Sequence, residues 1–306
     1  MAGALLRDLT QLPGMNALAT RDPRAEPLPP AIEVFTPASA EDALRLVADC
    51  IERSDATWII APESGGVLER LSAEVLARGR CLLGSRPAAV RIAASKARTA
   101  ATLNGCGVPV VPTWDPGGPI PSGAGPVVLK PDDGVGCLGT RLYPDVADAI
   151  AAWVRAGRDP NAVLQPFVEG DAASLSLLVA EGRAVVLGVN RQIVVCHDGC
   201  FRFQGCAVNG LASWQIPLAG LAQRVAEALP GLWGYVGVDF ILTDEGAVVL
   251  EVNPRLTTSY VGLRESIGEN PAAWVLGLLD QAAPLPAAPP ALRSVEVRVE
   301  PERAVA

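Results

Sequence analysis

Two apolar segments within residues 235–253 are expected to pair as a β-hairpin, and this hairpin constrains the fold more than any other feature. Residues 243–246 separate them and have the Asp and Gly content of a turn. The turn places Asp239 opposite position 250, and a bulge of one residue brings Asp239 level with Glu251. The chain is therefore expected to contain antiparallel sheet with two acids in its apolar strands.

The second strand of this hairpin carries polar and apolar side chains in alternation. Glu251 and Asn253 share one face, while Leu250 and Val252 are expected on the other, apolar face. Each carboxylate would repel a phosphate about 4 Å away by roughly 4 kcal/mol at an effective dielectric near 20. A divalent cation reverses that sign, and Mg²⁺, or Mn²⁺ in its place, binds carboxylate and phosphate oxygens. The pattern predicts Asp239, Glu251 and Asn253 as metal ligands; the alternative is a solvated hairpin edge.

Three cations are candidates for contacting phosphate. Lys130 ends an apolar strand, and the loop after it contains Gly134 and Gly136, whose backbone N–H groups can approach a phosphate closely. This is no Walker A loop, because no Gly-Lys-Ser/Thr sequence ends it. Lys96 opens a helix, and the alternative is an ordinary solvated lysine at a helix start. Nearly all the positive charge of the chain is Arg, so lysine is rare, and this rarity favours a phosphate contact. Arg255 can neutralise a transferring phosphoryl group or hold a carboxylate.

A candidate nucleotide-base segment begins at Gln165 and leaves one subdomain for another. Its backbone from Gln165 to Val168 can pair with the edge of an adenine, and Phe167 can pack against the ring. Glu169 or Asp171 can reach a ribose hydroxyl. The alternative is an ordinary edge strand.

The order of the expected elements indicates a chain of α/β and α+β class. Residues 31–95 alternate short apolar runs with helical patterns, as in a doubly wound unit, but residues 5–12 are expected to form a helix where such a unit begins with a strand. The first strand is therefore in doubt. We expect subdomains at 1–95, 96–165 and 166–306: a Rossmann-like unit, a small α+β unit and an antiparallel sheet.

Charge and composition limit the partners. A formal net charge of -8 and a pI near 4.9 disfavour nucleic-acid binding, which needs clustered Lys and Arg. No apolar run approaches the roughly 20 residues of a membrane span, and the amino terminus does not resemble a signal peptide. Seven cysteines without an evenly spaced framework indicate free thiols, so a cytoplasmic location is expected.

A second polar cluster, at residues 196–206, contains three cysteines and the single histidine, His197. Its spacing fits no standard zinc finger, since the second Cys-x-x-Cys pair is absent. A nucleophile system based on His197 would lack the Gly-x-Ser-x-Gly elbow. A loop without metal or catalysis is the favoured interpretation.

Taken in order, these motifs resemble the ATP-grasp superfamily over residues 58–279. The resemblance implies a Rossmann-like pre-ATP-grasp subdomain, a small lid and an antiparallel-sheet subdomain, with ATP and Mg²⁺ as cofactors. The residues that carry it are Lys96, Lys130 with its glycine loop, the connector from Gln165 to Val168, Asp239, Glu251 and Asn253.

Four further segments, at 60–66, 83–85, 189–192 and 208–210, look like the tyramine–glutamate ligase group of methanofuran biosynthesis. This resemblance implies that ATP activates the glutamate side-chain carboxylate as an acyl phosphate, which the nitrogen of tyramine or tyrosine then attacks. The resemblance also covers the synthesis of the methanofuran analogue that bacterial methylotrophs use in one-carbon metabolism. Arg255 would assist phosphoryl transfer, and Arg191 would hold an acidic substrate group; the alternative for Arg191 is a surface ion pair.

Two other functions stay open at this point. One is a different ATP-grasp carboxylate–amine ligase in amino-acid or cofactor synthesis, because substrate pockets vary on a shared nucleotide site. The other is a nucleotide-binding regulatory protein without turnover. The expected partners are small molecules, an amino acid and an amine, with no nucleic acid and no membrane; a homodimer is left open.

Overall fold

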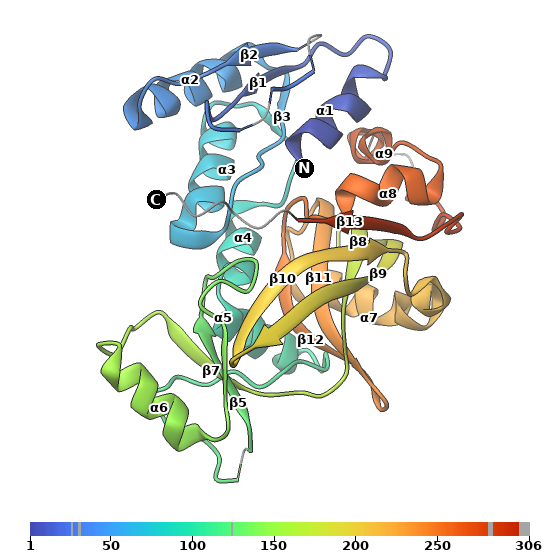
Figure 1. Ribbon diagram of the computed structural model, residues 1–306. Helices are drawn as coiled ribbons and strands as arrows, with labels where there is room; N and C mark the ends of the chain where they lie inside the picture. Colours follow the sequence, from blue (N-terminus) through green and yellow to red (C-terminus); the bar gives the residue numbers. More distant parts are fainter. Residues whose placement is uncertain (26, 30–31, 124, 281–283, 300–306) are drawn as a thin grey trace.

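A computed structural model describes residues 1–25, 27–29, 32–123, 125–280 and 284–299. An α/β module at the start of the chain, a small lid and a large curled sheet follow one another along it (Figure 1). In the part of the chain so described, no helix is both long enough and apolar enough to cross a bilayer.

The amino-terminal module is built from two short parallel strand pairs and the helices around them. β1 pairs with β2, and β3 pairs with β4. The expected doubly wound pattern is thus present, and the doubted first strand exists as β1, three residues that are too few to give a periodic signal. The module consists of α1 (Ala2–Thr10), β1 (Leu18–Thr20), β2 (Glu33–Phe35), α2 (Ala40–Arg53), β3 (Ala56–Thr57), the 3-10 turn η1 (Ser64–Gly66), α3 (Val67–Ala77), β4 (Cys81–Leu82) and α4 (Pro87–Ala93).

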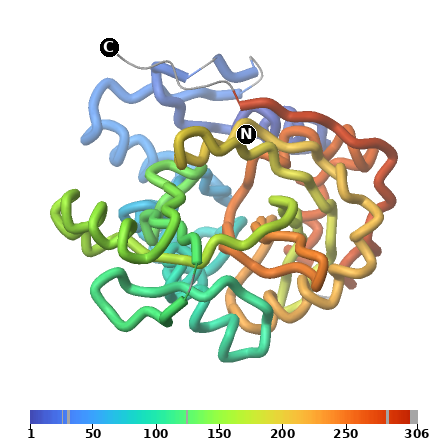
Figure 2. Tube along the Cα trace, turned by 60° about the horizontal axis from the view of Figure 1, so that its bottom comes forward, coloured from blue at the N-terminus to red at the C-terminus, as the bar shows by residue number. Residues whose placement is uncertain are grey.

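The first helix packs away from this module. Figures 1 and 2 show α1, the blue start of the chain, beside the orange helices α8 (Tyr260–Ile267) and α9 (Pro271–Gly277). The buried carboxylate of Asp8 accepts hydrogen bonds from Tyr260 and Arg264 at 2.9 Å each. The buried Tyr260 and the partly exposed Arg264 thus hold the buried acid of α1 against the sheet domain.

The lid begins with α5 (Lys96–Gly105), whose first turn Ser95 caps through the N–H of Arg98. It continues through β5 (Val127–Pro131), β6 (Arg141–Tyr143), α6 (Val146–Arg155) and β7 (Ala162–Pro166). β6 pairs with β10 (Cys200–Val208), so the lid strands extend the large sheet and do not form a separate one.

The large sheet has nine strands in the order β12-β11-β8-β9-β10-β6-β5-β7, with β13 paired to β10. Its remaining strands are antiparallel, as expected: β8 (Asp171–Ala180), β9 (Arg183–His197), β11 (Gly234–Thr243), β12 (Gly246–Asn253) and β13 (Val295–Arg298). A short 3-10 turn, η2 (Ala212–Trp214), leads into α7 (Gln215–Ala228), which covers one face.

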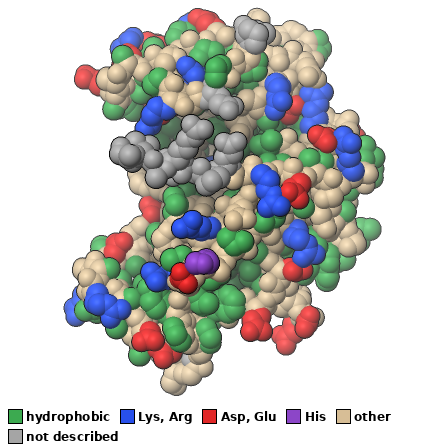
Figure 3. Space-filling model, in the orientation of Figure 1, with side chains coloured by type: hydrophobic (Ala, Val, Ile, Leu, Met, Phe, Trp, Pro, Cys, Tyr) green, Lys and Arg blue, Asp and Glu red, His purple; other side chains and the backbone are tan. Residues whose placement is uncertain are grey.

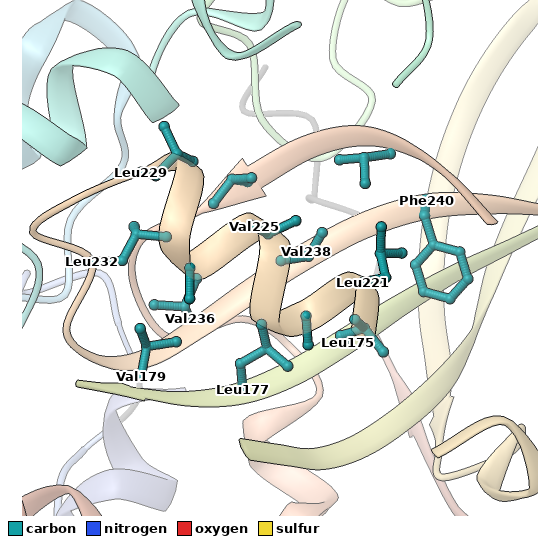
Figure 4. Close-up of a cluster of buried hydrophobic side chains, with 14 of the residues drawn as sticks. Leu175, Leu177, Val179, Leu221, Val225, Leu229, Leu232, Val236, Val238 and Phe240 are labelled. Atoms are coloured by element: carbon teal, nitrogen blue, oxygen red, sulfur yellow. The ribbon is translucent and has the colours of Figure 1, made fainter. Parts of the chain in front are cut away.

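The main core lies between α7 and the strands β8 and β11 (Figure 4). Leu221, Val225 and Leu229 from the helical segment meet Leu177 and Val236 from the sheet, and all of these side chains are buried. Full burial of one such side chain contributes about 1.5–3 kcal/mol. The sheet that carries the candidate site is therefore firmly supported from one side.

Candidate active site

The β11–β12 hairpin has the predicted register. Asp239 pairs with Glu251, and a bulge lies between Asp239 and Phe240. Val252 is buried in the core as expected. The prediction for Leu250 was wrong: this residue is the extra one in the bulge, and it lines the cavity in front of the acids. The bulge therefore both aligns the acids and turns an apolar side chain toward them.

Asp239, Glu251 and Asn253 meet on one face. The carboxyl groups of Asp239 and Glu251 are hydrogen-bonded to each other, and Asn253 donates through Nδ2 to Asp239 Oδ2 at 3.2 Å. Burial, followed by the charge of Glu251, raises the pKa of Asp239 well above its usual value. Burial also acts to raise the pKa of Glu251, but the charges of Lys96 and Lys130 outweigh it and lower that pKa. The two carboxyl groups therefore differ, since the pKa of Asp239 is raised and that of Glu251 is lowered.

Both lysines of the chain lie beside this acid pair. Lys96 Nζ is 3.2 Å from Glu251 Oε2, and it donates to the backbone oxygens of Asp132 at 3.2 Å and Gly134 at 2.8 Å. Lys130 is buried, and burial lowers its pKa to about 8 although the charge of Glu251 raises it. Two buried cations beside two partly buried acids form a charged centre in the sheet domain.

The glycine loop after β5 is fixed at its base. Asp132 accepts the N–H of Ala97 at the start of α5 at 2.8 Å, and Asp133 accepts the N–H of Gly65 at 2.9 Å. Gly136 has a φ of 63°, a conformation that favours glycine. A side chain at Gly134 would come within 3.1 Å of Pro131. These two positions require glycine for the loop to hold this shape.

A cavity of about 160 Å³ opens in front of the charged centre. Phe167 lines it and stacks on Phe201 with ring centroids 6.3 Å apart. Gln165 lines it as well, and its side chain donates to Thr113 at 2.8 Å. The lining includes the charged residues Lys96, Lys130, Asp239 and Glu251, and the rest is mainly apolar: Val128, Cys137, Leu138, Val168, Val194, Ile241 and Leu250. This mixture of charged and apolar groups suits a ligand that has an aromatic ring and a charged tail.

Five predicted site residues lie outside the lining of this cavity: Gly136, Asn253, Asp171, Arg191 and Arg255. Asp171 and Arg191 form an ion pair at 2.7 Å, and each side chain is about half exposed. Arg255 lies deeper, where it makes two contacts of 2.8 Å with Glu63 and donates to the backbone oxygen of Leu256. A ribose contact for Asp171 and a substrate contact for Arg191 stay predictions.

Sequence reasoning missed two polar residues of the site. Gln192 donates through Nε2 to Asp239 Oδ1 at 2.8 Å and lines the cavity. Alternation along β9 could have found it, because Arg191 and its neighbour Gln192 must point to opposite faces. Glu63, buried against Arg255, carried no such signal, since these residues are 192 positions apart.

The segment around His197 is a pair of strands rather than the loop that was expected. Cys200 pairs with His197 across the β9–β10 hairpin, and the side chains of His197 and Asp198 are both 86% exposed. On the face shown in Figure 3, the single histidine lies among interspersed acidic and basic side chains. The seven cysteines, all within the described residues, carry free thiols.

The donor set at Asp239, Glu251 and Asn253 fits a divalent cation. No cluster of three or more His, Cys, Asp or Glu side chains is placed to hold a metal among the described residues. Two carboxylates and an amide are nevertheless the hard oxygen donors that Mg²⁺ uses together with phosphate. Burial and the charge of Glu251 raise the pKa of Asp239, and a divalent cation beside the two carboxylates would oppose both effects.

Comparison with known proteins agrees with this arrangement. The ATP-grasp domain family matches residues 93–259, and the pre ATP-grasp 3 domain family matches residues 15–90. A tyramine–L-glutamate ligase from Methanocaldococcus jannaschii is 34% identical over 106 residues, which are 35% of this chain and 33% of that protein. The match thus spans about a third of the length of this curated relative.

Two solved structures are similar over most of the chain. A protein from Archaeoglobus fulgidus assigned to the ATP-grasp superfamily has a TM-score of 0.65 at 26% identity, covering 87% of this chain and 74% of its own. An L-amino acid ligase from Bacillus licheniformis has a TM-score of 0.67 at 17% identity, covering 90% and 70%. The second likeness concerns the fold alone. Because the family match covers more than half of the chain and agrees with the fold, the chain belongs to the ATP-grasp family.

Proposed function

We propose that this protein is an ATP-dependent carboxylate–amine ligase, which forms an amide through an acyl phosphate while ATP becomes ADP and phosphate. The observation that carries the proposal is the charged centre: Asp239 and Glu251 line the cavity together with Lys96 and Lys130, and Asn253 donates to Asp239. Such a centre suits a polyphosphate with its cation. Membership of the ATP-grasp family supports the same assignment.

The proposed reaction has two steps. In the first, a carboxylate oxygen of the acid substrate attacks the γ-phosphorus of ATP, and the bond to the bridging oxygen breaks as ADP leaves. In the second, the amine nitrogen attacks the acyl carbon, phosphate leaves with the bonding electrons, and the nitrogen loses a proton. The protein must align the partners and exclude water that would hydrolyse the acyl phosphate.

Each group of the chain then has a role in alignment or charge. Lys96 and Lys130 would contact phosphate oxygens, and the loop with Gly134 and Gly136 would cover them. Gln165, Phe167 and Val168 would hold the nucleotide base in the apolar part of the cavity. Bound Mg²⁺, held by the hairpin acids, would supply the positive charge that offsets the charge of the phosphates.

Arg255 would act on the transferring phosphoryl group. A guanidinium has five N–H donors, and the contacts of Arg255 with Glu63 and Leu256 use three of them. Two donors therefore stay available on a residue that follows Asn253 by two positions. The charge of Arg255 also acts to lower the pKa of Asp239, which supports a position near the proposed metal ligands.

We infer that the substrates are glutamate and tyramine or tyrosine, in the synthesis of methanofuran or its methylotroph analogue. The support is the partial identity to a tyramine–L-glutamate ligase. Other acid and amine pairs are the alternative, because pockets change more readily than the nucleotide site.

An ADP-release assay tests the proposal. Glutamate with tyramine or tyrosine is compared with a panel of other acids and amines, at fixed ATP and Mg²⁺. We expect ADP release that needs both an acid and an amine and is fastest with glutamate and tyramine. Absence of turnover with every pair, despite binding of ATP, would contradict the ligase assignment; faster turnover with another pair would change only the substrates.

A further inference from the structure

Glu63 is a buried carboxylate with one oxygen in use and one without a partner. Glu63 is 5% exposed, and its Oε2 accepts two contacts of 2.8 Å from Arg255. Its Oε1 is buried and makes no hydrogen bond; among the described residues, the only other such side-chain atom is Thr57 Oγ1. A buried acceptor without a donor costs free energy, and more so when it is charged. A bound donor would remove that cost.

Glu63 lies beside the glycine loop and close in sequence to residues that bind it. It lies directly before Ser64 and Gly65, which bind the backbone oxygen and the carboxylate of Asp133 in the glycine loop at 2.7 and 2.9 Å. Its partner Arg255 comes two residues after Asn253 in the acid set. Glu63 therefore lies where the amino-terminal module meets the glycine loop and the residues that follow the β11–β12 hairpin.

Glu63 and Arg255 together have an unused hydrogen-bond acceptor and unused donors. Arg255 retains two free N–H donors for a phosphoryl or carboxylate oxygen, and Glu63 retains Oε1 for a donor. A carboxylate binds a positively charged donor more strongly than a neutral one, because the hydrogen bond is charge-assisted. Substrate ammonium groups are donors of this kind.

We propose that Glu63 Oε1 accepts a hydrogen bond from the primary ammonium group of a substrate. This rests on the proposed ligase function, in which both substrates can bring such a group: the acid through its α-ammonium, and the amine before it loses its proton. Glu63 binds and orients this group, while Arg255 stays fixed by the other carboxylate oxygen. No covalent step at Glu63 is involved.

Calorimetry with the intact protein and MgADP tests the assignment without turnover. Glutamate is compared with glutarate, which lacks the ammonium, and tyramine is compared with 4-ethylphenol, in the wild type and in Glu63→Gln. The amide oxygen of Gln keeps an acceptor for Arg255, while the charge is lost. We expect the wild type to prefer one ammonium compound over its analogue about 10- to 100-fold, and Glu63→Gln to lose that preference.

The exposed Glu74 of the same module, paired with Arg78, provides the matched control Glu74→Gln, which should keep the preference. If Glu63→Gln loses the preference for glutamate over glutarate, the α-ammonium of the acid is the group that Glu63 binds. If it loses the preference for tyramine over 4-ethylphenol, the group is the ammonium of the amine. A wild type without preference for either compound, or a preference that survives in Glu63→Gln, would overturn the proposal. Lost preference together with absent ADP release would leave the Glu63 contact standing and remove only the ligase assignment.

Discussion

The amino-terminal module and the large sheet differ in how much apolar surface holds them together. The sheet domain contains a continuous buried cluster between α7, β8 and β11. In the module, the separate cluster has only three buried members within the described residues: Ile51, Val75 and Leu82. Groups that need a fixed geometry, such as Asp239 and Glu251, lie in the sheet, and the module adds polar groups from a loop.

The loop at Glu63 joins these two regions through polar contacts. Glu63 pairs with Arg255, and Ser64 and Gly65 bind Asp133. Such contacts depend on direction and distance more than apolar packing does. The comparison teaches that the sheet is held by a large apolar core, to which α1 and α4 of the module also contribute, while the loop at Glu63 adds contacts that depend on exact geometry.

A matched pair of core truncations would test the difference most strongly. Leu177→Ala in the sheet should lower the free energy of unfolding by about 3–5 kcal/mol, because a cavity opens in tightly packed surroundings. Leu82→Ala in the module should cost about 2–3 kcal/mol, since the smaller cluster can relax. Urea unfolding followed by tryptophan fluorescence and by circular dichroism measures both. Equal losses in one common transition would contradict the distinction between the regions.

The link between the regions should show a smaller but still large effect. Arg255→Met leaves the carboxylate of Glu63 buried without a cation, which costs about 3 kcal/mol. Arg78→Met breaks a more exposed pair and should cost less than about 1 kcal/mol. Urea titrations of both variants give the values.

The double variant Glu63→Leu with Arg255→Met serves as the control for this link. It should be more stable than Arg255→Met alone, because no unpaired charge stays buried. If the double variant loses as much as the sum of the two single variants, the two residues act independently and the link is wrong.

Much of this organisation was predictable because local signals were strong. The turn at residues 243–246 and the alternating strands set the register of Asp239 and Glu251, including the bulge. The side chain of Asp145 caps α6 by accepting the N–H of Asp148 at 2.8 Å, a local contact of the kind that a sequence pattern can encode. In these places the hydrophobic pattern and the turn chemistry agree with the final fold.

Other elements gave weak local signals. In β10 the alternation is broken by a bulge between Phe203 and Gly205, so the strand resembled a loop. Pro217 and Gly220 occupy the early turns of α7, and they reduce its helical signal although a first-turn proline is tolerated. β13 forms through its pairing with a distant strand, which no local pattern encodes.

The candidate site shows the same difference between residues with strong and residues with weak local signals. The acids and lysines were predictable because charges in apolar strands need compensation. Charge alone did not point to Gln192 on β9, which is uncharged and reaches Asp239, while Arg191 pairs with Asp171 on the surface. The apolar walls of the cavity come from several distant strands that only the fold brings together.

Lys130 gives a more modest prediction for the sheet side of the comparison. Burial lowers its pKa to about 8, so in the free protein it loses its positive charge as the pH rises through that value. The affinity for ADP should then fall about tenfold between pH 7 and pH 9.5, because ADP binds the charged form of Lys130 better. Each pKa unit by which binding raises the pKa of this lysine corresponds to a tenfold change in affinity. Lys130→Arg keeps its charge and should show no such fall. Calorimetry across this pH range measures it, and parallel profiles for the two proteins would contradict a phosphate contact of Lys130.

The magnesium dependence of ADP binding tests the central claim, that the acids of the hairpin form the metal and nucleotide site. Calorimetry with and without Mg²⁺ is carried out on the wild type, on Glu251→Gln and on Glu245→Gln, whose exposed acid lies in the turn of the same hairpin. We predict that Mg²⁺ strengthens ADP binding at least about tenfold in the wild type and in Glu245→Gln, and not in Glu251→Gln. The same gain from Mg²⁺ in Glu251→Gln would contradict the account.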